Sequence, residues 1–232
     1  MQIALLIPTL NEERLLARTL AYTCTLPFDE LIVVDGGSHD RTVPIAESLV
    51  ACSPIPRVAI VSAPRGRARQ MNAGAAQAQS EILVFLHADT WLPPNAREAI
   101  ERALEDPNCV GGRFDVQFES DKGWAWIISR LMNLRSRWSG IATGDQALFV
   151  RRRVFEEMGG FAEIPIMEDI DFSARLKRRG RLAPLREKVT TSFRRWEQQG
   201  PVYTILHMWT LRLLYWMGIS PNILRHFYGH AR

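Results

Sequence analysis

Several acidic residues stand at positions where an ordered element is expected to begin or end. Asp35 and Asp89 each come after an aliphatic run, and Glu168 and Asp169 open a helical pattern. Such runs are typical of buried strands, and ligands of open α/β sheets bind beyond the carboxyl ends of the strands. Like charges gathered at one edge need a cation or basic side chains to compensate them. These residues therefore predict a site for a divalent metal and a phosphorylated ligand.

Two turn segments, 8–13 and 33–42, place carboxylates before helical patterns. Asp35 is followed by Gly36 and Gly37, and glycines let a ligand approach the backbone closely. A carboxylate in such a turn can accept hydrogen bonds from a base or from ribose hydroxyls. A strand-to-helix turn with a capping aspartate is the alternative interpretation of either segment alone.

His87, Ala88 and Asp89 follow another apolar run, so Asp89 is expected to project into the same edge. Mg²⁺ or Mn²⁺ takes one or two protein carboxylates and fills its remaining positions with water and substrate phosphates. For Glu168 and Asp169, capping of a helix is one interpretation and general-base catalysis is the other.

The elements that would position these residues alternate along the first half of the chain. Four apolar runs predict strands: 3–7, 31–34, 58–61 and 82–86. Helical patterns follow them, the first with Asn11 as its expected N-cap. This alternation predicts an α/β fold with a doubly wound, mostly parallel sheet and helices on both faces.

The second half is less regular. It predicts a strand at 110–118, an aromatic helix at 124–138, a strand at 147–150 and a helix at 168–179. The apolar tail at 202–217 is shorter than the roughly 20 residues that span a bilayer, so it is not expected to cross one.

Composition narrows the function classes. The 232 residues are 47% hydrophobic and 23% charged, an ordinary globular mixture, with a net charge of +4. Because arginines alternate with carboxylates instead of forming one basic stripe, no nucleic-acid partner is expected. Three scattered cysteines indicate neither a disulfide framework nor a zinc site, and favour a reducing, cytoplasmic location.

Taken in order, six segments resemble those of family 2 glycosyltransferases with the GT-A fold. They are 8–13, 33–42, 67–74, 87–89, 144–146 and 168–169. The resemblance covers roughly residues 3–181 and implies a Rossmann-like GT-A domain. It also implies an inverting, metal-assisted transfer of one sugar from a nucleoside diphosphate sugar, with a UDP-sugar as the first expectation, to an acceptor hydroxyl.

The resemblance also implies roles for single residues. Those that would hold the nucleotide sugar are Pro8, Thr9, Glu12, Asp35, Gly36, Arg67, Asn72, His87, Ala88, Asp89, Gly144 and Asp145. Asp89 would ligate Mg²⁺ or Mn²⁺, and Asp169 would be the catalytic base. The family's Asp-x-Asp motif reads His87-Ala88-Asp89 here, so Asp89 is expected to carry more of the metal site alone.

The segment 194–199 resembles the Gln-x-x-Arg-Trp motif of processive members, with Ser192 at the glutamine position. Acceptor contacts are accordingly expected from Glu168, Arg195 and Trp196, although an exposed basic turn explains the segment equally well. The expected organisation is a glycosyltransferase domain at 1–200, divided into a nucleotide-sugar-binding half (1–108) and an acceptor and catalytic half (109–200), and amphipathic helices at 201–232.

Two other functions fit parts of the sequence. A nucleotidyltransferase of related fold usually has a glycine-rich basic loop after the first strand, whereas segment 9–13 is acidic. A sugar-nucleotide-binding module without transferase activity would not need both Asp89 and Asp169.

The tail has a wide apolar face with arginines near it in sequence, which suits the interface of an anionic membrane. Docking of that face on the protein's own core is the alternative. The first interpretation predicts peripheral attachment to the inner face of the cell membrane and a lipid-linked or other amphipathic acceptor.

Overall fold

The computed structural model describes residues 1–120 and 122–228. Its strands are β1 Ile3–Thr9, β2 Glu30–Asp35, β3 Arg57–Ser62, β4 Ile82–Phe85, β5 Thr90–Trp91, β6 Cys109–Phe118, β7 Leu148–Arg151 and β8 Arg181–Thr191. Its helices are α1 Leu16–Thr23, α2 Thr42–Val50, α3 Arg67–Gln77, α4 Ala96–Leu104, α5 Gly123–Ser139, α6 Arg152–Glu157, α7 Glu168–Leu176, α8 Arg194–Gln199, α9 Pro201–Trp216 and α10 Pro221–Tyr228, with a 3₁₀ turn at Gly144–Gln146.

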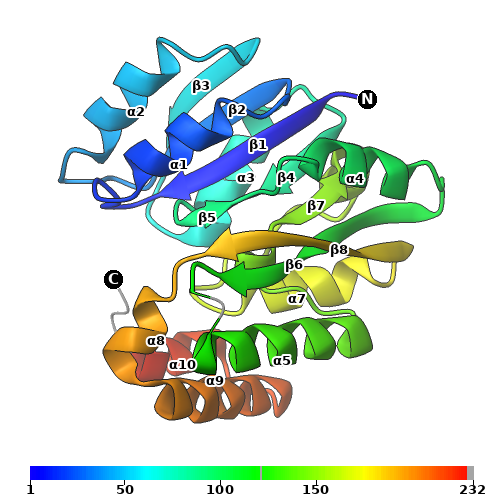
Figure 1. Cartoon of the computed structure of the whole chain (residues 1–232). Helices are drawn as coiled ribbons and strands as arrows, with labels where there is room; N and C mark the ends of the chain where they lie inside the picture. Colours follow the sequence, from blue (N-terminus) through cyan, green and yellow to red (C-terminus); the bar gives the residue numbers. More distant parts are fainter. Residues whose placement is uncertain (121, 229–232) are drawn as a thin grey trace.

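These strands form one sheet in the order β3-β2-β1-β4-β7-β6-β8-β5 (Figure 1). In its first half, β1 pairs in parallel with β2 and β4, and β2 pairs in parallel with β3. The register places Thr9 opposite Asp35, so the carboxyl ends of β1 and β2 lie at the same edge. The expected parallel, doubly wound arrangement is confirmed for this half.

Antiparallel pairing enters in the second half. β7 runs antiparallel to β4, with Leu148 opposite Phe85, and it also runs antiparallel to β6. The start of β7 therefore lies beside the end of β4. This brings the loop that precedes β7 to the edge where the acidic residues gather.

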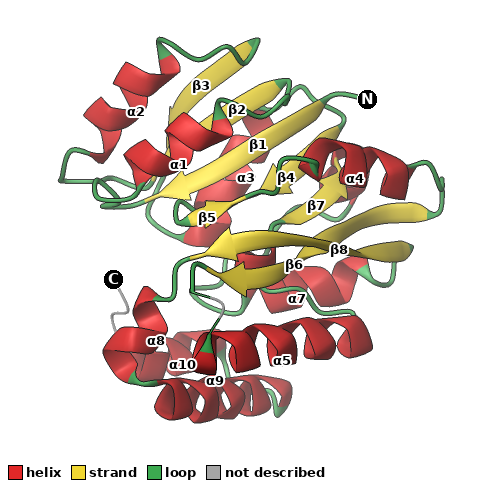
Figure 2. Ribbon diagram, in the orientation of Figure 1, coloured by secondary structure: helices red, strands yellow, loops and turns green. Residues whose placement is uncertain are grey.

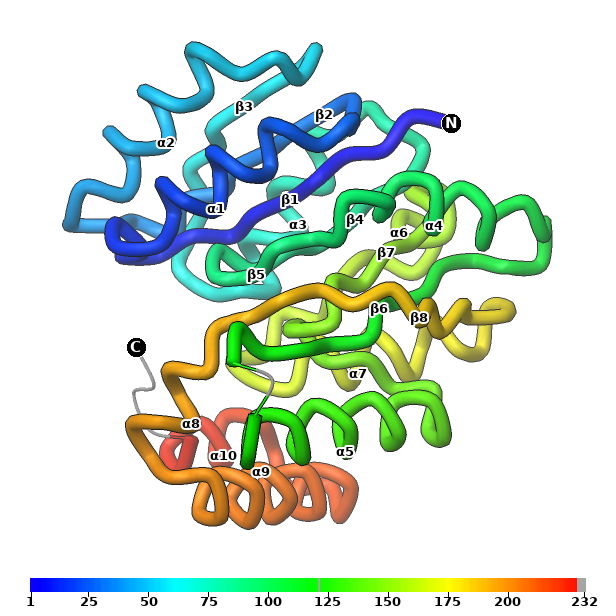
Figure 3. Tube along the Cα trace, in the orientation of Figure 1, coloured from blue at the N-terminus to red at the C-terminus, as the bar shows by residue number. Residues whose placement is uncertain are grey.

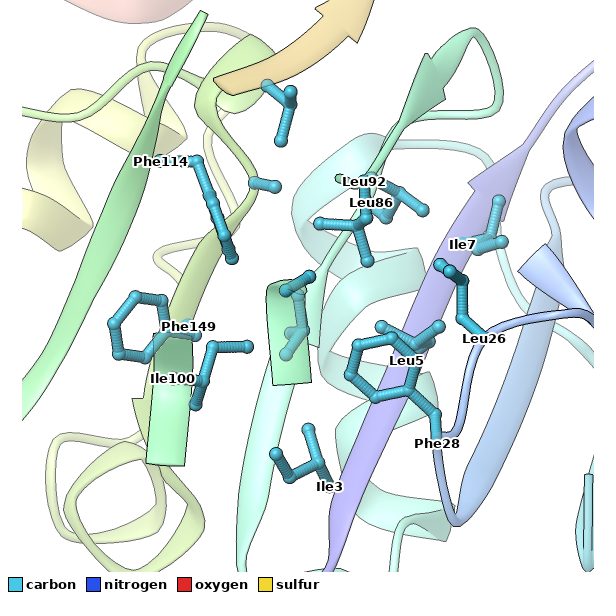
Figure 4. Packing of buried hydrophobic residues seen from close by; sticks show 14 of the residues in the cluster. Ile3, Leu5, Ile7, Leu26, Phe28, Leu86, Leu92, Ile100, Phe114 and Phe149 are labelled. Atoms are coloured by element: carbon cyan, nitrogen blue, oxygen red, sulfur yellow. The ribbon is translucent and has the colours of Figure 1, made fainter. Parts of the chain in front are cut away.

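Helices cover both faces of the sheet (Figure 2). One buried cluster joins the sheet to α1, α2 and α4, and includes Leu5, Ile7 and Ile100 (Figure 4). A second cluster on the other face joins it to α3, α6 and α7, and includes Met71 and Phe172. The strands in the middle carry apolar residues on both faces because both faces are covered.

The remaining helices gather at one end of the molecule, where the chain trace runs from α8 through α10 alongside α5 (Figure 3). Leu211 and Leu224 of α9 and α10 pack against Ile166, Met167 and Ile170 at the start of α7. No helix within residues 1–120 and 122–228 has the length and apolarity needed to cross a membrane.

The first helix differs from expectation. Asn11 is not its N-cap, because α1 begins at Leu16 and Asn11 has a φ of 54°. The Asn11 side chain instead accepts a hydrogen bond from the backbone of His39, 2.9 Å away. Asn11 thus joins the two turns at the sheet edge, a contact between residues distant in sequence.

The helix expected at 168–179 also differs from expectation, because α7 ends earlier, at Leu176.

A glycine pair in β6 lets the two neighbouring strands approach. A Cβ at Gly112 would lie 2.2 Å from the carbonyl oxygen of Ala183, and one at Gly111 would lie 2.4 Å from that of Phe149. Both neighbours are backbone atoms, which cannot move without disturbing the sheet. These two positions therefore exclude any side chain.

We expect Gly112→Ala to lower the free energy of unfolding by about 2 kcal/mol or more, as overpacking against a rigid neighbour does. Gly123→Ala is a matched control, because a Cβ there meets nothing within 4 Å and only its φ of 54° is unfavourable, which costs about 1 kcal/mol. Urea unfolding measures both. An equal or larger loss in the Gly123 variant would contradict the packing argument.

Candidate active site

The turns after β1 and β2 hold the first group of candidate residues. Asp35 is buried, and its carboxylate accepts hydrogen bonds from the backbone N–H groups of Gly37 and Ser38, each at 2.9 Å, and from the Ser38 hydroxyl at 2.5 Å. Thr9 is also buried and donates to the carbonyl of Val34. These hydrogen bonds close the turn after β2 and fix the orientation of the carboxylate, but Asp35 does not cap a helix, because α2 begins only at Thr42.

The side chain of Gln70 on α3 is hydrogen-bonded to the backbone of these turns. Its Nε2 donates to the carbonyl oxygens of Thr9 and Val34 at 2.7 and 2.9 Å. A Cβ at Gly36 would lie 2.9 Å from the Gln70 side chain, so only glycine fits there without displacing it. Glu12 is buried nearby, 4.0 Å from the Arg194 guanidinium.

His87 meets Asp145 because β7 runs antiparallel to β4. Nδ1 of His87 lies 3.2 Å from a carboxylate oxygen of Asp145. Burial alone would raise the pKa of Asp145, but the hydrogen bond and charge of His87, together with the charge of Arg67, lower it to about 2. Asp145 is therefore ionised at neutral pH, and a proton must lie on Nδ1 for the hydrogen bond to form.

The other nitrogen of His87, Nε2, is buried and has no hydrogen-bond partner in the described part of the chain. The backbone of Gly144 lies against it, since a Cβ there would come within 2.3 Å. Buried polar atoms are rarely left unpaired, so this nitrogen marks a position for a ligand group or water.

Asp169 stands at the start of α7, as the sequence predicts. Its carboxylate accepts hydrogen bonds from the backbone N–H groups of Gly144 and Ile170, both at 2.8 Å. Bonds of this charge-assisted kind contribute roughly 1.5–3 kcal/mol each. The 3₁₀ turn that presents Gly144 is itself held by a capping box between Thr143 and Gln146.

Glu168 is buried and lies 3.5 Å from the Arg67 guanidinium. Burial raises the pKa of Glu168, with Arg67 opposing and Asp169 adding to the shift. Burial disfavours the charge of Arg67, but Glu168, Tyr228, Asp169 and Asp145 outweigh it and raise the pKa of Arg67. Arg67 is thus a permanent cation.

A small pocket opens between these groups. Arg67, His87, Gly144 and Asp169 line it, and its remaining wall is apolar: Pro8, Met71, Phe85, Leu86, Leu148 and Phe161, with Thr143. The structure thus brings together residues from α3, the end of β4, the turn before β7 and the start of α7.

Asp89 is half-buried, and the described residues offer its carboxylate no hydrogen-bond partner. Within the same residues, no group of three or more His, Cys, Asp or Glu side chains could hold a metal alone. Asp89 therefore fits a Mg²⁺ or Mn²⁺ ion that takes most of its ligands from substrate phosphates and water.

Other candidates lie in structural contacts. The Asn72 side chain donates a hydrogen bond to the carbonyl oxygen of Phe161 and accepts one from the Phe161 N–H, both at 2.9 Å. The carbonyl of Ala88 accepts from the Thr19 hydroxyl at 2.6 Å. The proposed donor contacts of Asn72 and Ala88 stay predictions.

Arg195 and Trp196 are half-buried and so do not form an exposed turn. Arg195 donates to the Tyr228 hydroxyl at 2.6 Å and stacks over its ring, and Trp196 packs on Phe118 and Phe193. Arg135 and Arg212 also interact electrostatically with Asp145 and Asp169, and sequence reasoning did not assign either arginine to the site. The sequence offered one indication that Arg212 belongs to the site: this charged residue interrupts an otherwise apolar helical face.

The family model of "Glycosyl transferase family 2" matches residues 4–162. The probable glycosyltransferase YdaM of Bacillus subtilis is 26% identical over 75% of this chain and 46% of its own length. Beta-monoglucosyldiacylglycerol synthase of Synechocystis is 26% identical over 85% of this chain and 46% of its own. An undecaprenyl-phosphate 4-deoxy-4-formamido-L-arabinose transferase of Pseudomonas syringae is 28% identical over 64% of this chain and 46% of its own. The chain spans about half the length of these curated relatives.

Among solved structures, the mannosyltransferase PcManGT of Pyrobaculum calidifontis, in complex with GDP-Man and Mn²⁺, superimposes with a TM-score of 0.69 at 21% identity, over 91% of this chain and 60% of its own. TarS 1-349 of S. aureus, in complex with UDP-GlcNAc, gives 0.65 at 17% identity, over 83% of this chain and 58% of its own. These likenesses confirm the GT-A fold. Together with the family model, which covers more than half of the sequence, they place the chain in glycosyl transferase family 2.

Proposed function

We propose that this protein is an inverting glycosyltransferase that moves one sugar from a nucleoside diphosphate sugar to an acceptor hydroxyl. The observation that carries the proposal is the position of Asp169, whose carboxylate is oriented by Gly144 and Ile170 at the wall of a pocket that it shares with Arg67 and His87. A fixed carboxylate beside a permanent cation is what a displacement of a diphosphate by a hydroxyl requires.

In this reaction Asp169 takes the acceptor proton as the acceptor oxygen attacks the anomeric carbon. A bond forms from that oxygen to the carbon, the bond from the carbon to the diphosphate oxygen breaks, and the configuration inverts. Arg67 stabilises the charge that develops on the leaving diphosphate. His87, which contacts Asp145, lines the same pocket, and Glu168 lies 3.5 Å from the Arg67 guanidinium and helps to hold it in place.

The 1–108 half supplies the donor site in this proposal, with Thr9, Glu12 and Asp35 toward the nucleoside. A Mg²⁺ or Mn²⁺ ion at Asp89 would neutralise the diphosphate and make it a better leaving group. The mannosyltransferase relative with GDP-Man and Mn²⁺ supports a divalent ion, and the UDP-GlcNAc complex of TarS supports a UDP-sugar as the first donor to test.

A lipid-linked acceptor is supported by a surface at the helical end of the molecule. We call it the apolar platform: the exposed Trp124, Trp126, Leu131, Leu134 and Trp138 of α5, and Leu206, Trp209, Leu213 and Trp216 of α9. Trp138 is 89% exposed and Trp216 is 73% exposed. Large contiguous apolar patches mark interaction sites, and tryptophans beside cations suit a membrane interface.

Cations border this platform. Arg130 stacks on Trp126 at 4.4 Å, and Lys122, the residue just before α5, is exposed. The names of two relatives, undecaprenyl-phosphate 4-deoxy-4-formamido-L-arabinose transferase and beta-monoglucosyldiacylglycerol synthase, also support an amphipathic acceptor. We therefore propose peripheral attachment to an anionic membrane, on its cytoplasmic side.

Replacing the proposed base tests the reaction. Asp169→Asn keeps an oxygen that can accept from Gly144 but cannot take a proton, so we expect turnover to fall by about 10²-fold or more. Donor affinity, measured by calorimetry with UDP, should stay within about twofold. Asp171→Asn is the matched control, because Asp171 pairs with Arg175 on the same helix. A larger loss in Glu168→Gln or in the control would assign the base elsewhere.

Metal dependence is tested separately. We expect Asp89→Ala to lose most donor hydrolysis with Mg²⁺ or Mn²⁺ and to keep the wild-type melting temperature, since the carboxylate holds no described partner. Glu98→Ala, an exposed carboxylate on α4, is the control. Full activity of the Asp89 variant, or of wild-type protein in excess chelator, would rule out a metal at Asp89.

Vesicle sedimentation tests the apolar platform. Wild-type protein should bind vesicles that contain phosphatidylglycerol, and salt should weaken the binding because charges are screened within about 8 Å at physiological ionic strength. Trp138→Glu and Trp209→Glu should abolish it, and Gln77→Glu on the distant α3 should not. Failure of the wild type to sediment even at low salt removes the membrane proposal and leaves the transferase proposal intact.

A further inference from the structure

Three arginines approach the active site from helices whose residues take no part in the reaction proposed above. Arg135 of α5, Arg195 of α8 and Arg212 of α9 are defined here as the arginine cluster. All three guanidinium groups interact electrostatically with Asp145. The cluster therefore lies beside the pocket, on the side of the helical end.

Each arginine of the cluster has a buried Nε without a hydrogen-bond partner in residues 1–120 and 122–228. The partners described for the other nitrogens are neutral: Arg195 donates to Tyr228 at 2.6 Å and to the sulfur of Met208 at 3.6 Å, and Arg135 donates to the Thr143 hydroxyl at 3.5 Å. No member of the cluster lies within 4.0 Å of a described carboxylate oxygen.

Other buried arginines of this protein are treated differently. Arg113 and Arg137 on the neighbouring β6 and α5 each contact Asp115 at 2.6 Å. Burial is costly for a guanidinium unless an anion compensates it. Asp115 is in direct contact with Arg113 and Arg137, whereas Asp145 and Asp169 act on the arginine cluster only from beyond 4.0 Å among the described residues.

The charges of the cluster also oppose one another. Burial lowers the pKa of Arg135, and the nearby charge of Arg212 lowers it further, to about 10. Burial lowers the pKa of Arg212 as well. A dianion placed between them would relieve both the repulsion and the missing hydrogen bonds.

Phosphate is the anion that suits this arrangement, because planar guanidinium groups bind its oxygens in pairs. In the proposed function, the donor diphosphate would have its own cations, Arg67 and a metal ion held by Asp89. By contrast, Arg135 and Arg212 stand on α5 and α9, the same two helices that carry the apolar platform on their outer faces. A molecule with a phosphate head and an apolar chain can meet both features at once.

We propose that Arg135, Arg195 and Arg212 form a binding site for a phosphate group on the acceptor substrate. This rests on the proposed glycosyltransferase function and names the chemical class of its second substrate: a phosphorylated, apolar molecule. The reacting hydroxyl, or a phosphate oxygen acting in its place, would then lie near Asp169.

Binding without turnover tests the site. The probes are octyl phosphate below its micellar concentration, octanol as the neutral match, inorganic phosphate, and UDP with Mn²⁺, each titrated by calorimetry. We expect wild-type protein to bind octyl phosphate at least 10-fold more tightly than octanol, and to do so with UDP already bound. Arg135→Gln and Arg212→Gln should each weaken octyl phosphate binding about 10-fold or more and leave UDP affinity within about twofold. Arg186→Gln, an exposed arginine of β8 that lies outside both the arginine cluster and the apolar platform, should change neither.

Three results overturn the proposal: no binding of octyl phosphate to wild-type protein, equal binding of octanol, or competition between octyl phosphate and UDP, which would assign the cluster to the donor. Binding of inorganic phosphate as tight as that of octyl phosphate keeps the phosphate site but overturns the apolar part of the proposal, and assigns the site to a soluble acceptor. The wild-type comparison needs no variant, so misfolding of an arginine variant leaves the test valid. Because no sugar is transferred, failure here is separate from failure of the transferase assay.

Discussion

The site depends on how the charges of carboxylates at one sheet edge are compensated. Asp145 relies on a histidine, Glu168 on an arginine, and Asp169 on two backbone N–H groups. Burial raises the pKa of a carboxyl group, as it does for Glu168, and a nearby cation opposes that shift. The helix α3, the end of β4, the turn before β7 and the start of α7 must therefore all be in place before the carboxylates have these partners. The site is a property of the assembled fold and not of any one segment.

The two halves of the sheet make different contributions to that assembly. The parallel half aligns the carboxyl ends of β1, β2 and β4 through its register, so their turns meet without further adjustment. The antiparallel pairing of β7 with β4 then delivers the loop at 143–147 to the same edge. For this, β6 must fit closely between β7 and β8, which the absence of side chains at Gly111 and Gly112 allows.

The sequence predicts the first half of the fold well because its central strands are buried on both faces and read as continuous apolar runs. Such a signal is missing for β8, which alternates buried and exposed residues, carries several charges and pairs with β5 only at Thr190 and Thr191. The two-residue β5 is too short to show any pattern. Motif resemblance named the acidic residues of the site, but contacts such as Gln70 with Thr9, or Arg195 with Tyr228, join segments whose approach only the folded chain determines. Asn11 illustrates the same limit: its type suits a cap, and the turn that it caps lies elsewhere.

Helix α9 is apolar toward solvent at Leu206, Trp209, Leu213 and Trp216, and carries Arg212 toward the site. Successive residues of an α-helix are rotated by about 100°, so one inserted or deleted residue between Trp209 and Arg212 would turn the remainder of the helix by that angle. The arginine would leave its place, and the apolar stripe would be broken in the same step. Only changes of about seven residues nearly restore the phase, with a drift of about 20°. The spacing between the apolar stripe and Arg212 is therefore constrained far more tightly by the helix geometry than the identity of the individual apolar residues, which can be exchanged for one another.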